Sequence, residues 1–150
     1  MPRVPEGGPG WPLARLVALA EGSPAGEVCG LLVRGADGQV EAWPIDNASG
    51  SPATTFELEP RRLLEALRRL DELGWQVGAV YHSHLAGGAG LSARDLAGAL
   101  IDGVPLLGGV AQVVVALRGG QATVVRVHRW NGLTYEPADL WSRQPSPPSG

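Results

Sequence analysis

Hydrophobic positions at helical spacing mark three segments of the chain. In residues 60–73 leucines recur at every third or fourth position, with arginines and acidic residues between them, which predicts an amphipathic helix with one face on a core. Pro60 suits the first turn of this helix and Gly74 suits its end. Similar apolar spacing predicts two further helices, over residues 12–20 and 92–101.

Continuous apolar runs and turn signals predict strands between these helices. The run VCGLLV at 28–33 lacks polar positions, which is typical of a strand buried on both faces. Asp37-Gly38 and Gly119-Gly120 stand where tight turns would join two pairs of strands. The strands expected on this basis are 28–33, 40–45, 56–58, 77–83, 110–117, 122–128 and 133–135. Helices and turn-paired strands together predict an α/β or α+β domain with a mixed sheet, not a regular doubly wound fold.

A chain of 150 residues is long enough to bury the core of one domain. The periodic segments lie within residues 11–141, which we expect to form that domain. Residues 1–10 and the Pro/Ser-rich residues 142–150 show no such pattern. We therefore expect a flexible N-terminus and a disordered tail.

Charge and cysteine content narrow the classes of function. The net charge is only −3 and both signs are mixed along the chain, which argues against a nucleic acid or a membrane surface as partner. No apolar run is long enough to span a bilayer, and the N-terminus lacks a signal-peptide pattern. The single cysteine, Cys29, excludes an internal disulfide and suits a reducing compartment. We therefore expect a cytoplasmic protein.

Two of the three histidines, His82 and His84, stand one residue apart at the end of the predicted strand 77–83. Side chains alternate along a strand, so both imidazoles would point to the same face and could share one metal ion. A lone His-x-His pair is more often two unrelated histidines, so the neighbouring residues must decide. The third histidine, His128, ends another predicted strand, and we expect it to be a partly exposed structural residue.

Ser92 and Asp95 follow the histidine pair at the start of the predicted helix 92–101. Their Ser-x-x-Asp spacing is typical of a helix N-cap, and this structural role is compatible with metal binding. Two histidines and one carboxylate are a typical catalytic zinc set, in which the fourth position is left to water. Cys29 could instead close the site as a fourth ligand. Asp102, seven residues beyond Asp95 on the same predicted helix face, is an alternative carboxylate.

A water at such a site needs a general base. Glu27 is the candidate, because it stands directly before the predicted buried strand 28–33. A carboxylate at the start of a strand is often only a surface residue or a turn partner. Judged by itself, Glu27 would therefore carry no functional prediction.

The candidate residues share the order and spacing of a known motif. It consists of an upstream glutamate, then His-Ser/Thr-His, seven residues, Ser, two residues and Asp. The matching positions in this chain are Glu27, His82, Ser83, His84, Ser92 and Asp95. The chain thus resembles the JAMM/MPN+ (JAB) zinc metallopeptidase family, in particular its small stand-alone prokaryotic members. The segments GEVCGLLVRG, PIDNASGSPATTFELEPRRLLEAL and VGAVYHSHLAG add to the resemblance, which extends over residues 13–135.

The resemblance implies an MPN domain with a cytidine-deaminase-like layout, a curved mixed β-sheet flanked by helices. It implies one Zn²⁺ held by His82, His84 and Asp95. Glu27 would act as the general base, and Ser92 would hydrogen-bond the tetrahedral oxyanion. Small stand-alone relatives act on ubiquitin-like or sulfur-carrier proteins next to a C-terminal Gly-Gly. Such a carrier protein is the partner that the resemblance implies.

One departure from the family lies beside the motif. Family members commonly have proline after the second histidine, whereas this chain has the glycine-rich loop 85–91, LAGGAGL. Glycine would loosen this connection and the substrate groove beside it. Two other functions stay open, a non-catalytic MPN binding module and a zinc hydrolase of small amides. A bound zinc ion and peptidase activity would separate the enzyme from the binding module.

Overall fold

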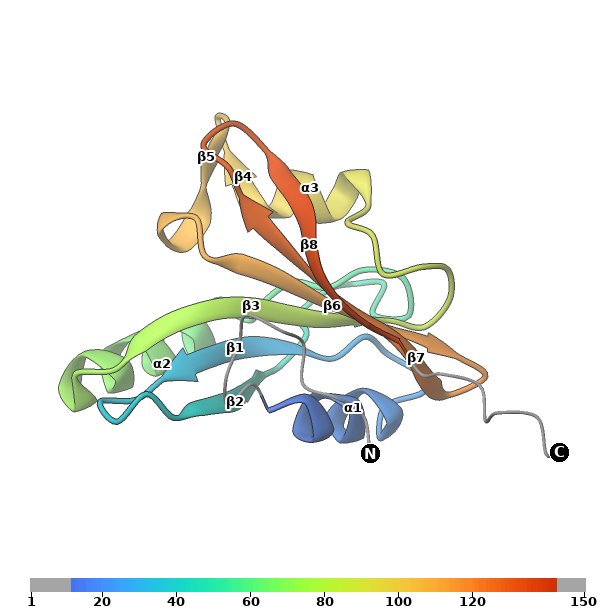
Figure 1. The fold of residues 1–150 in the computed structure, drawn as a ribbon, viewed down its shortest axis with the longest axis horizontal. Helices are drawn as coiled ribbons and strands as arrows, with labels where there is room; N and C mark the ends of the chain where they lie inside the picture. The colour runs from blue at the N-terminus through green and yellow to red at the C-terminus, as the bar shows by residue number, and fades with distance from the viewer. Residues whose placement is uncertain (1–11, 143–150) are drawn as a thin grey trace, which may run out of the picture.

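The computed structural model describes residues 12–142. Its main feature is a six-stranded sheet with the strand order β2-β1-β3-β6-β7-β8 (Figure 1). Neighbouring strands are antiparallel, except for the parallel central pair β3 and β6, so the sheet is mixed. The elements are α1 (Leu13–Glu21), β1 (Cys29–Arg34), β2 (Val40–Ile45), α2 (Pro60–Leu73), β3 (Gln76–His84), α3 (Ala93–Ala99), β4 (Leu100–Ile101), β5 (Val104–Pro105), a 3₁₀ turn (Leu106–Gly108), β6 (Ala111–Arg118), β7 (Gln121–Trp130) and β8 (Tyr135–Ser142).

Local signals explain where helix α2 begins and ends. The Glu59 side chain caps it by accepting a hydrogen bond from a backbone N–H of the first turn, and Pro60 occupies the first helical position. Gly74 ends the helix in the left-handed conformation, with φ of +70°, which only glycine adopts without cost. The predicted helix over 60–73 and the predicted strand over 40–45 are both confirmed.

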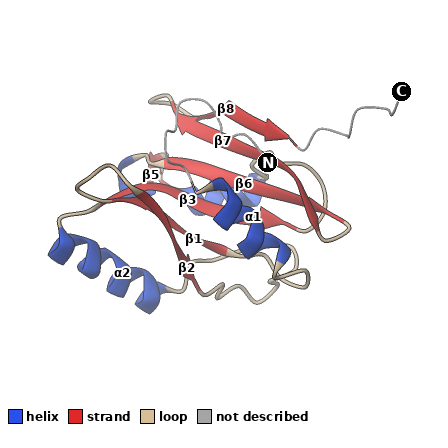
Figure 2. Cartoon of the chain, turned by 60° about the horizontal axis from the view of Figure 1, so that its bottom comes forward, coloured by secondary structure: helices blue, strands red, loops and turns tan. Residues whose placement is uncertain are grey.

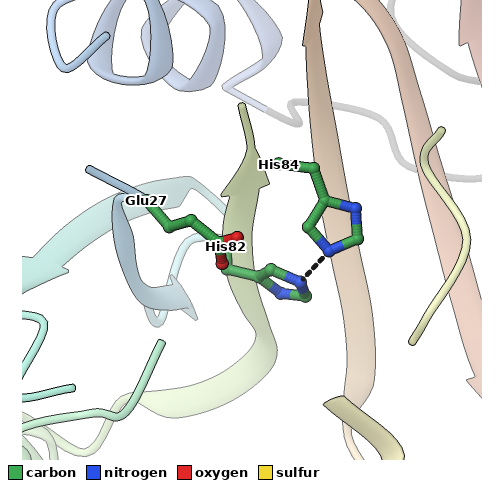
Figure 3. Close-up of side chains that lie close together, drawn as sticks. All are labelled: Glu27, His82 and His84. Atoms are coloured by element: carbon green, nitrogen blue, oxygen red, sulfur yellow. Dashed lines mark hydrogen bonds between the residues drawn. The ribbon is translucent and has the colours of Figure 1, made fainter. Parts of the chain in front are cut away.

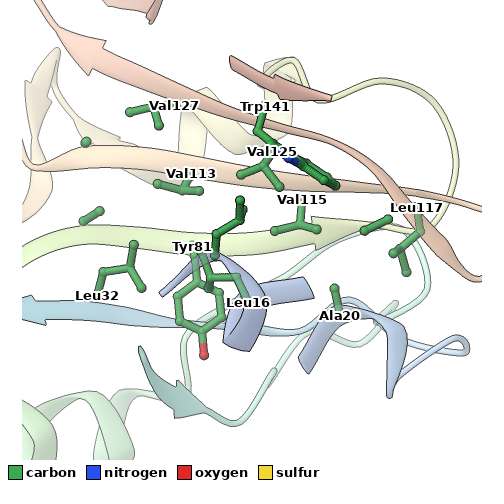
Figure 4. Close-up of a cluster of buried hydrophobic side chains, with 14 residues drawn as sticks. Leu16, Ala20, Leu32, Tyr81, Val113, Val115, Leu117, Val125, Val127 and Trp141 are labelled. Carbon is green, nitrogen blue, oxygen red and sulfur yellow. The ribbon is translucent and has the colours of Figure 1, made fainter. Parts of the chain in front are cut away.

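Different elements cover the two faces of the sheet. Alternate residues of the central strands, such as Tyr81, pack with α1 in the main hydrophobic core (Figure 4), and α1 lies across this face in Figure 2. The intervening residues point to the other face. At one end of that face, Val80 and its neighbours pack against α2. Toward the other end, a smaller cluster around Val114 includes Ala89 of the loop 85–91. The candidate site lies on this second face.

The last strand is longer than predicted. β8 runs over Tyr135–Ser142, whereas the sequence indicated a strand only over 133–135. β8 is the outer strand of the sheet and most of its residues are exposed or partly exposed. Pro137 lies inside it, which an edge strand tolerates because one row of its backbone groups has no ladder partner. A polar, proline-containing edge strand lacks the apolar period on which the prediction depended.

The third helix is shorter than predicted. α3 ends at Ala99, and residues 100–101 pair with residues 104–105 in a small hairpin. Asp102 lies in the turn of this hairpin, with φ of +52°. It does not share a helix face with Asp95, so the prediction of Asp102 as an alternative carboxylate on that face is wrong. The turn interrupts the helix because the hairpin pairs backbone groups that a longer α3 would need.

The predicted fold, an α/β domain with a curved mixed sheet flanked by helices, is confirmed. The predicted strand over 56–58 is wrong, since only Leu58 pairs there, in an isolated bridge with Asn47. This segment is instead part of the loop that leads from β2 to α2. Among the residues that the structure describes, no helix has the length and apolar character needed to cross a membrane.

The two ends of the chain lie outside the described residues 12–142. The predictions of a flexible segment over 1–10 and of a disordered tail over 142–150 therefore stay predictions. Of the second segment only Ser142 is described, and it is the last residue of β8.

Candidate active site

Strand β3 carries the two histidines of the motif. His82 and His84 point to the same face of the sheet, as the alternation along a strand requires. His82 is fully buried and His84 is partly buried. Their Nε2 atoms lie 3.0 Å apart (Figure 3). Both rings thus direct a nitrogen toward one point at the C-terminal end of β3.

The start of helix α3 brings Asp95 to the same point. The Ser92 Oγ accepts a hydrogen bond from the Asp95 backbone N–H, and the Asp95 Oδ2 accepts one from the Ser92 backbone N–H, both at 3.0 Å. This reciprocal capping box confirms the predicted N-cap and fixes the direction of the carboxylate. The same Oδ2 lies 3.2 Å from the Nε2 of His82 and 3.0 Å from the Nε2 of His84.

The three ligand atoms fit a tetrahedral metal ion. Their mutual distances are 3.0, 3.0 and 3.2 Å. Zinc bonds of about 2.0–2.1 Å place tetrahedral ligands roughly 3.3–3.4 Å apart, so only a small outward movement would seat the ion. The Nδ1 of His84 donates to the carbonyl oxygen of Gly88 at 2.8 Å. This bond leaves Nε2 as the ring nitrogen that could bind a metal ion, and it fixes the ring, as outer hydrogen bonds do at metal sites.

Glu27 approaches the histidines from the start of β1. Glu27, His82 and His84 each offer one ligand atom, and these atoms lie within 4.8 Å of one another. This spacing is wider than that of the Asp95 carboxylate, which suits a base better than a ligand. Glu27 is 6% exposed, and in the described part of the chain its Oε1 has no hydrogen-bond partner. Burial raises the pKa of Glu27 to about 7, which suits a group that takes up and returns a proton near neutral pH.

One amide side chain, Asn47, holds the Glu27 segment against the loop that follows β2. Its Nδ2 donates to the carbonyl oxygens of Glu27 and Thr55, each at 3.0 Å. Its Oδ1 accepts from the backbone N–H groups of Ser49 and Glu57, also at 3.0 Å. The amide thus makes all four of its hydrogen bonds. Asn47 therefore fixes the backbone of the candidate base relative to this loop.

Phe56 and Ser83 complete the support of the site. The Phe56 ring stacks on the His82 ring, with centroids 4.1 Å apart and an angle of 19° between the planes. The Ser83 Oγ accepts a hydrogen bond from the Val28 backbone N–H at 2.9 Å, which ties β3 to the residue after Glu27. Ser83 is a position of the predicted motif, but no supporting role was predicted for it, for Phe56 or for Asn47. For Asn47 a signal existed, because an asparagine directly after a strand often binds nearby backbone groups.

The charges at the three ligand positions suit a divalent cation. Burial lowers the pKa of His82. Burial acts in the same direction on His84, but its hydrogen bonds to Asp95 and Gly88 prevail and raise its pKa. Burial would raise the pKa of Asp95, but the hydrogen bonds from both histidines hold this pKa well below its usual range. Asp95 is therefore ionised at neutral pH and supplies negative charge at the centre of the site.

Cys29 does not join the group of ligand atoms. Its Sγ donates to the carbonyl oxygen of Ile45 at 3.3 Å. Burial raises the pKa of the Cys29 thiol to about 12, whereas a metal ligand must be a thiolate. The structure therefore gives no support to Cys29 as a fourth ligand that would close the site.

His128 is buried, so the prediction of a partly exposed residue is wrong. It is 4% exposed, and its Nε2 donates to the carbonyl oxygen of Ala89 at 2.8 Å. Burial lowers the pKa of His128, which favours the neutral ring with a single N–H. Ala89 belongs to the glycine-rich loop 85–91. This loop is thus bound at two places, by His84 and by His128, despite its glycines.

A cleft of about 660 Å³ opens beside Asp95. Its lining is mostly apolar and includes Phe56, Leu58 and Leu107. From α3 it includes Gly98, where no side chain narrows the space. The cleft therefore places an apolar surface that a substrate could occupy next to one of the candidate metal ligands, Asp95.

Most of the chain matches one known protein family. Residues 13–131 match the family described as prokaryotic homologs of the JAB domain. The matched range contains all the motif residues from Glu27 to Asp95, together with α1 and the strands from β1 to β7.

A curated protein shows similarity over a shorter segment. This chain is 42% identical over 53 residues to a protein of Thermus thermophilus named "Probable TtuB-protein conjugate cleaving protease". The segment covers 35% of this chain and 36% of the relative. The match thus spans about a third of the length of that relative.

Two solved structures share the fold. A solution structure of a protein from Desulfitobacterium hafniense gives a TM-score of 0.66 at 24% identity and covers 84% of each chain. A solution structure of a protein from Salinibacter ruber gives a TM-score of 0.57 at 23% identity and covers 91% of each chain. At such low identities the likeness shows the fold alone.

Proposed function

This chain belongs to the family of prokaryotic homologs of the JAB domain, and we propose that it is a zinc-dependent metallopeptidase acting on carrier proteins. Its proposed reaction is hydrolysis of the amide bond after the C-terminal Gly-Gly of a ubiquitin-like or sulfur-carrier protein. One observation carries this proposal. Three ligand atoms converge within 3.2 Å of one another, next to a buried carboxyl group whose Oε1 has no partner among the described residues.

His82, His84 and Asp95 would hold the zinc ion. Two imidazoles and one carboxylate are a donor set typical of catalytic zinc, and their spacing here suits such an ion. When bound, zinc supplies Lewis acidity and lowers the pKa of water toward neutrality. The charge of Asp95 compensates part of the charge of the ion.

Glu27 and Ser92 would act on the reacting groups. The Oε1 of Glu27 takes a proton from the attacking water and gives it to the leaving amine when the C–N bond breaks. The Ser92 Oγ already accepts a hydrogen bond from the Asp95 N–H. Its own O–H is thus available to donate to the substrate carbonyl oxygen as negative charge develops there.

Two features favour the tail of a carrier protein as substrate. The Thermus thermophilus relative is named as a protease that cleaves TtuB-protein conjugates. The mostly apolar cleft beside Asp95 has a volume of about 660 Å³. This volume is enough for a few residues of an extended peptide that binds along the backbone of the protein. Glycines suit the positions next to the cut because they have no side chain to clash there.

A panel of carrier fusions tests the proposed function. The zinc-loaded protein is expected to cut after Gly-Gly whatever residue follows, and a leucine in place of the last glycine should block the cut. Intact mass identifies the products. Equal cleavage of the leucine tail and the glycine tail would refute the carrier-tail substrate and favour a hydrolase of small amides. Zinc binding without cleavage of any fusion or small amide would favour a non-catalytic MPN module.

Removal of the Ser92 hydroxyl is expected to slow the chemical step. Ser92→Ala should lower kcat by about 10²–10³, the usual effect of losing one oxyanion donor. It should also destabilise α3 by about 0.5–2 kcal/mol as a lost N-cap. Ser92→Gly separates the two effects, because glycine caps a helix almost as well but has no hydroxyl. Wild-type kcat in Ser92→Gly would exclude Ser92 from catalysis.

A larger side chain at Gly98 is expected to obstruct the cleft without harming the fold. A Cβ at Gly98 would meet no atom within 4 Å, and leucine is a better helix former than glycine. Gly98→Leu should therefore raise KM by about tenfold, which corresponds to about 1.4 kcal/mol of lost binding. Its zinc content should equal that of the wild type, and its Tm should equal or exceed that of the wild type. Gly98→Ala is the matched control, and an unchanged KM in Gly98→Leu would show that substrate does not pass Gly98.

A further inference from the structure

The third histidine lies on β7, outside the group of candidate metal ligands. His128 pairs in register with Gln112 of β6, which pairs in turn with Val80 of β3. Residues opposite one another share a face of the sheet, so His128 lies on the same face as His82. His128 is buried and directs its Nε2 to the loop 85–91. Nothing in the proposed reaction uses it.

The loop 85–91 sets the distance between the two halves of the candidate metal site. It begins after His84 and ends before the capping residue Ser92. Gly87 has φ of +84°, and a Cβ at Gly88 or Gly90 would meet nothing within 4 Å. Such a segment has large backbone freedom of its own. The observed position of the loop therefore depends on the contacts that bind it.

Two successive carbonyl groups of this loop are bound by histidines. The Gly88 oxygen accepts from the Nδ1 of His84 and the Ala89 oxygen accepts from the Nε2 of His128, both at 2.8 Å. The Ala89 methyl group is buried in the cluster around Val114. The two carbonyls belong to adjacent peptide units, so a displacement of the Ala89 carbonyl also turns the Gly88 carbonyl that orients His84.

We propose that His128 is a positioning residue of the metal site. By holding the Ala89 carbonyl, it fixes the loop 85–91, orients the ring of His84 and sets where the cap of α3 presents Asp95. The inference rests on the proposed metal site, because only a bound ion requires this orientation.

Three variants separate this role from general stability. His128→Leu keeps the volume but removes the donor, and His128→Gln keeps an N–H at a similar distance along the side chain. Tyr135→Phe is the matched control, because it removes another side-chain hydrogen bond to a backbone carbonyl, from the Tyr135 O–H to Val110 at 2.9 Å, and Val110 is not part of the loop 85–91. Zinc affinity is measured by competition with a chromogenic chelator, and melting curves accompany each variant.

The expected result is a zinc affinity about tenfold weaker in His128→Leu, the lower end of the effect of removing an outer hydrogen bond at a metal site. His128→Gln should recover most of this loss, and Tyr135→Phe should bind zinc like the wild type. Wild-type affinity in His128→Leu would overturn the inference. Equal losses in all three variants would also overturn it, since they would indicate a general effect of stability. If His128→Leu does not fold, His128→Asn takes its place, because its amide is too short to reach Ala89.

A second readout does not depend on the metal. Arg94 is an exposed trypsin site in the first turn of α3, two residues after the capping residue Ser92. Trypsin should cut the metal-free His128→Leu protein after Arg94 several times faster than the wild type, and the other two variants should be cut at the wild-type rate. An unchanged rate would overturn the loop anchor. Failure of the wild type to bind zinc would instead refute the proposed function, and the cutting rates would still decide on the anchor.

Discussion

Glutamine in place of Glu27 is expected to give a folded, zinc-loaded protein that has lost nearly all activity. Glutamine has almost the same shape but cannot take a proton from water or return it to the leaving amine. The loss should reach about 10²–10⁴ in kcat, the usual contribution of a general base. KM should change little, because Glu27 is assigned to proton transfer and not to substrate binding. Steady-state kinetics on a carrier fusion measure both constants.

The same variant should not be less stable than the wild type. Burial raises the pKa of Glu27 to about 7 in the folded, metal-free protein, from 4.5 in an unfolded chain. The folded state therefore binds this proton more tightly, and the wild type loses stability as the pH rises from 4.5 to 7. A neutral glutamine avoids this loss. The Tm of metal-free Glu27→Gln at pH 8 should therefore equal or exceed that of the metal-free wild type.

Glu65→Gln is the matched control, since Glu65 is an exposed glutamate on α2. It should keep wild-type activity. Wild-type turnover in Glu27→Gln would remove Glu27 from the mechanism. Failure of Glu27→Gln to fold would show that the carboxyl group is needed for folding.

The parts of the site that the sequence predicted are those with local geometry. The alternation of a strand places His82 and His84 on one face, and a capping box fixes Asp95 relative to Ser92. Both rules act within a few residues, so spacing alone is informative. Glu27 lies 55 residues before His82, and no periodicity links the two positions. Its role was predicted only by resemblance, and the folded sheet brings it within 4.8 Å of the histidines.

The supporting hydrogen bonds could not be predicted because they join distant segments through single atoms. His128 reaches Ala89 across 39 residues, and Asn47 reaches Glu27 across 20. The residue types do not identify the partner: an asparagine after a strand indicates hydrogen bonds to backbone groups nearby in the sequence, and a histidine at a strand end indicates no particular partner. The glycines of the loop 85–91 suggested a loose connection, and the sequence carried no sign of the buried imidazole that holds it.

The fold errors have a related cause. The apolar period identifies elements that bury one face, and it predicted α2 with its observed bounds, whereas β2 was predicted as the return strand after the Asp37-Gly38 turn. β8 buries few of its residues and contains Pro137, so its backbone pairing with β7 defines it more than its side chains do. The end of α3 likewise depends on pairing between β4 and β5, which a helical period cannot reveal.

Asn in place of Asp95 is expected to abolish tight zinc binding. The amide keeps the shape of the carboxylate and can still accept from the Ser92 N–H, so the cap of α3 should survive. It lacks the negative charge that faces His82 and His84, and it is a poor zinc ligand. The affinity should fall by more than about 100-fold, because loss of a mere outer hydrogen-bond partner already costs about 10–100-fold. Metal analysis after dialysis against a chelator measures the loss, and His82→Ala should behave in the same way.

Cys29→Ala decides between an open catalytic site and a closed structural one. The Cys29 thiol donates a hydrogen bond to the carbonyl oxygen of Ile45, and burial raises its pKa to about 12. The variant should therefore keep one zinc ion per chain and wild-type turnover. Loss of zinc in Cys29→Ala would mean that a fourth protein ligand closes the site. A closed site has no position for the attacking water, and the peptidase assignment would then fall even if Asp95→Asn behaved as expected.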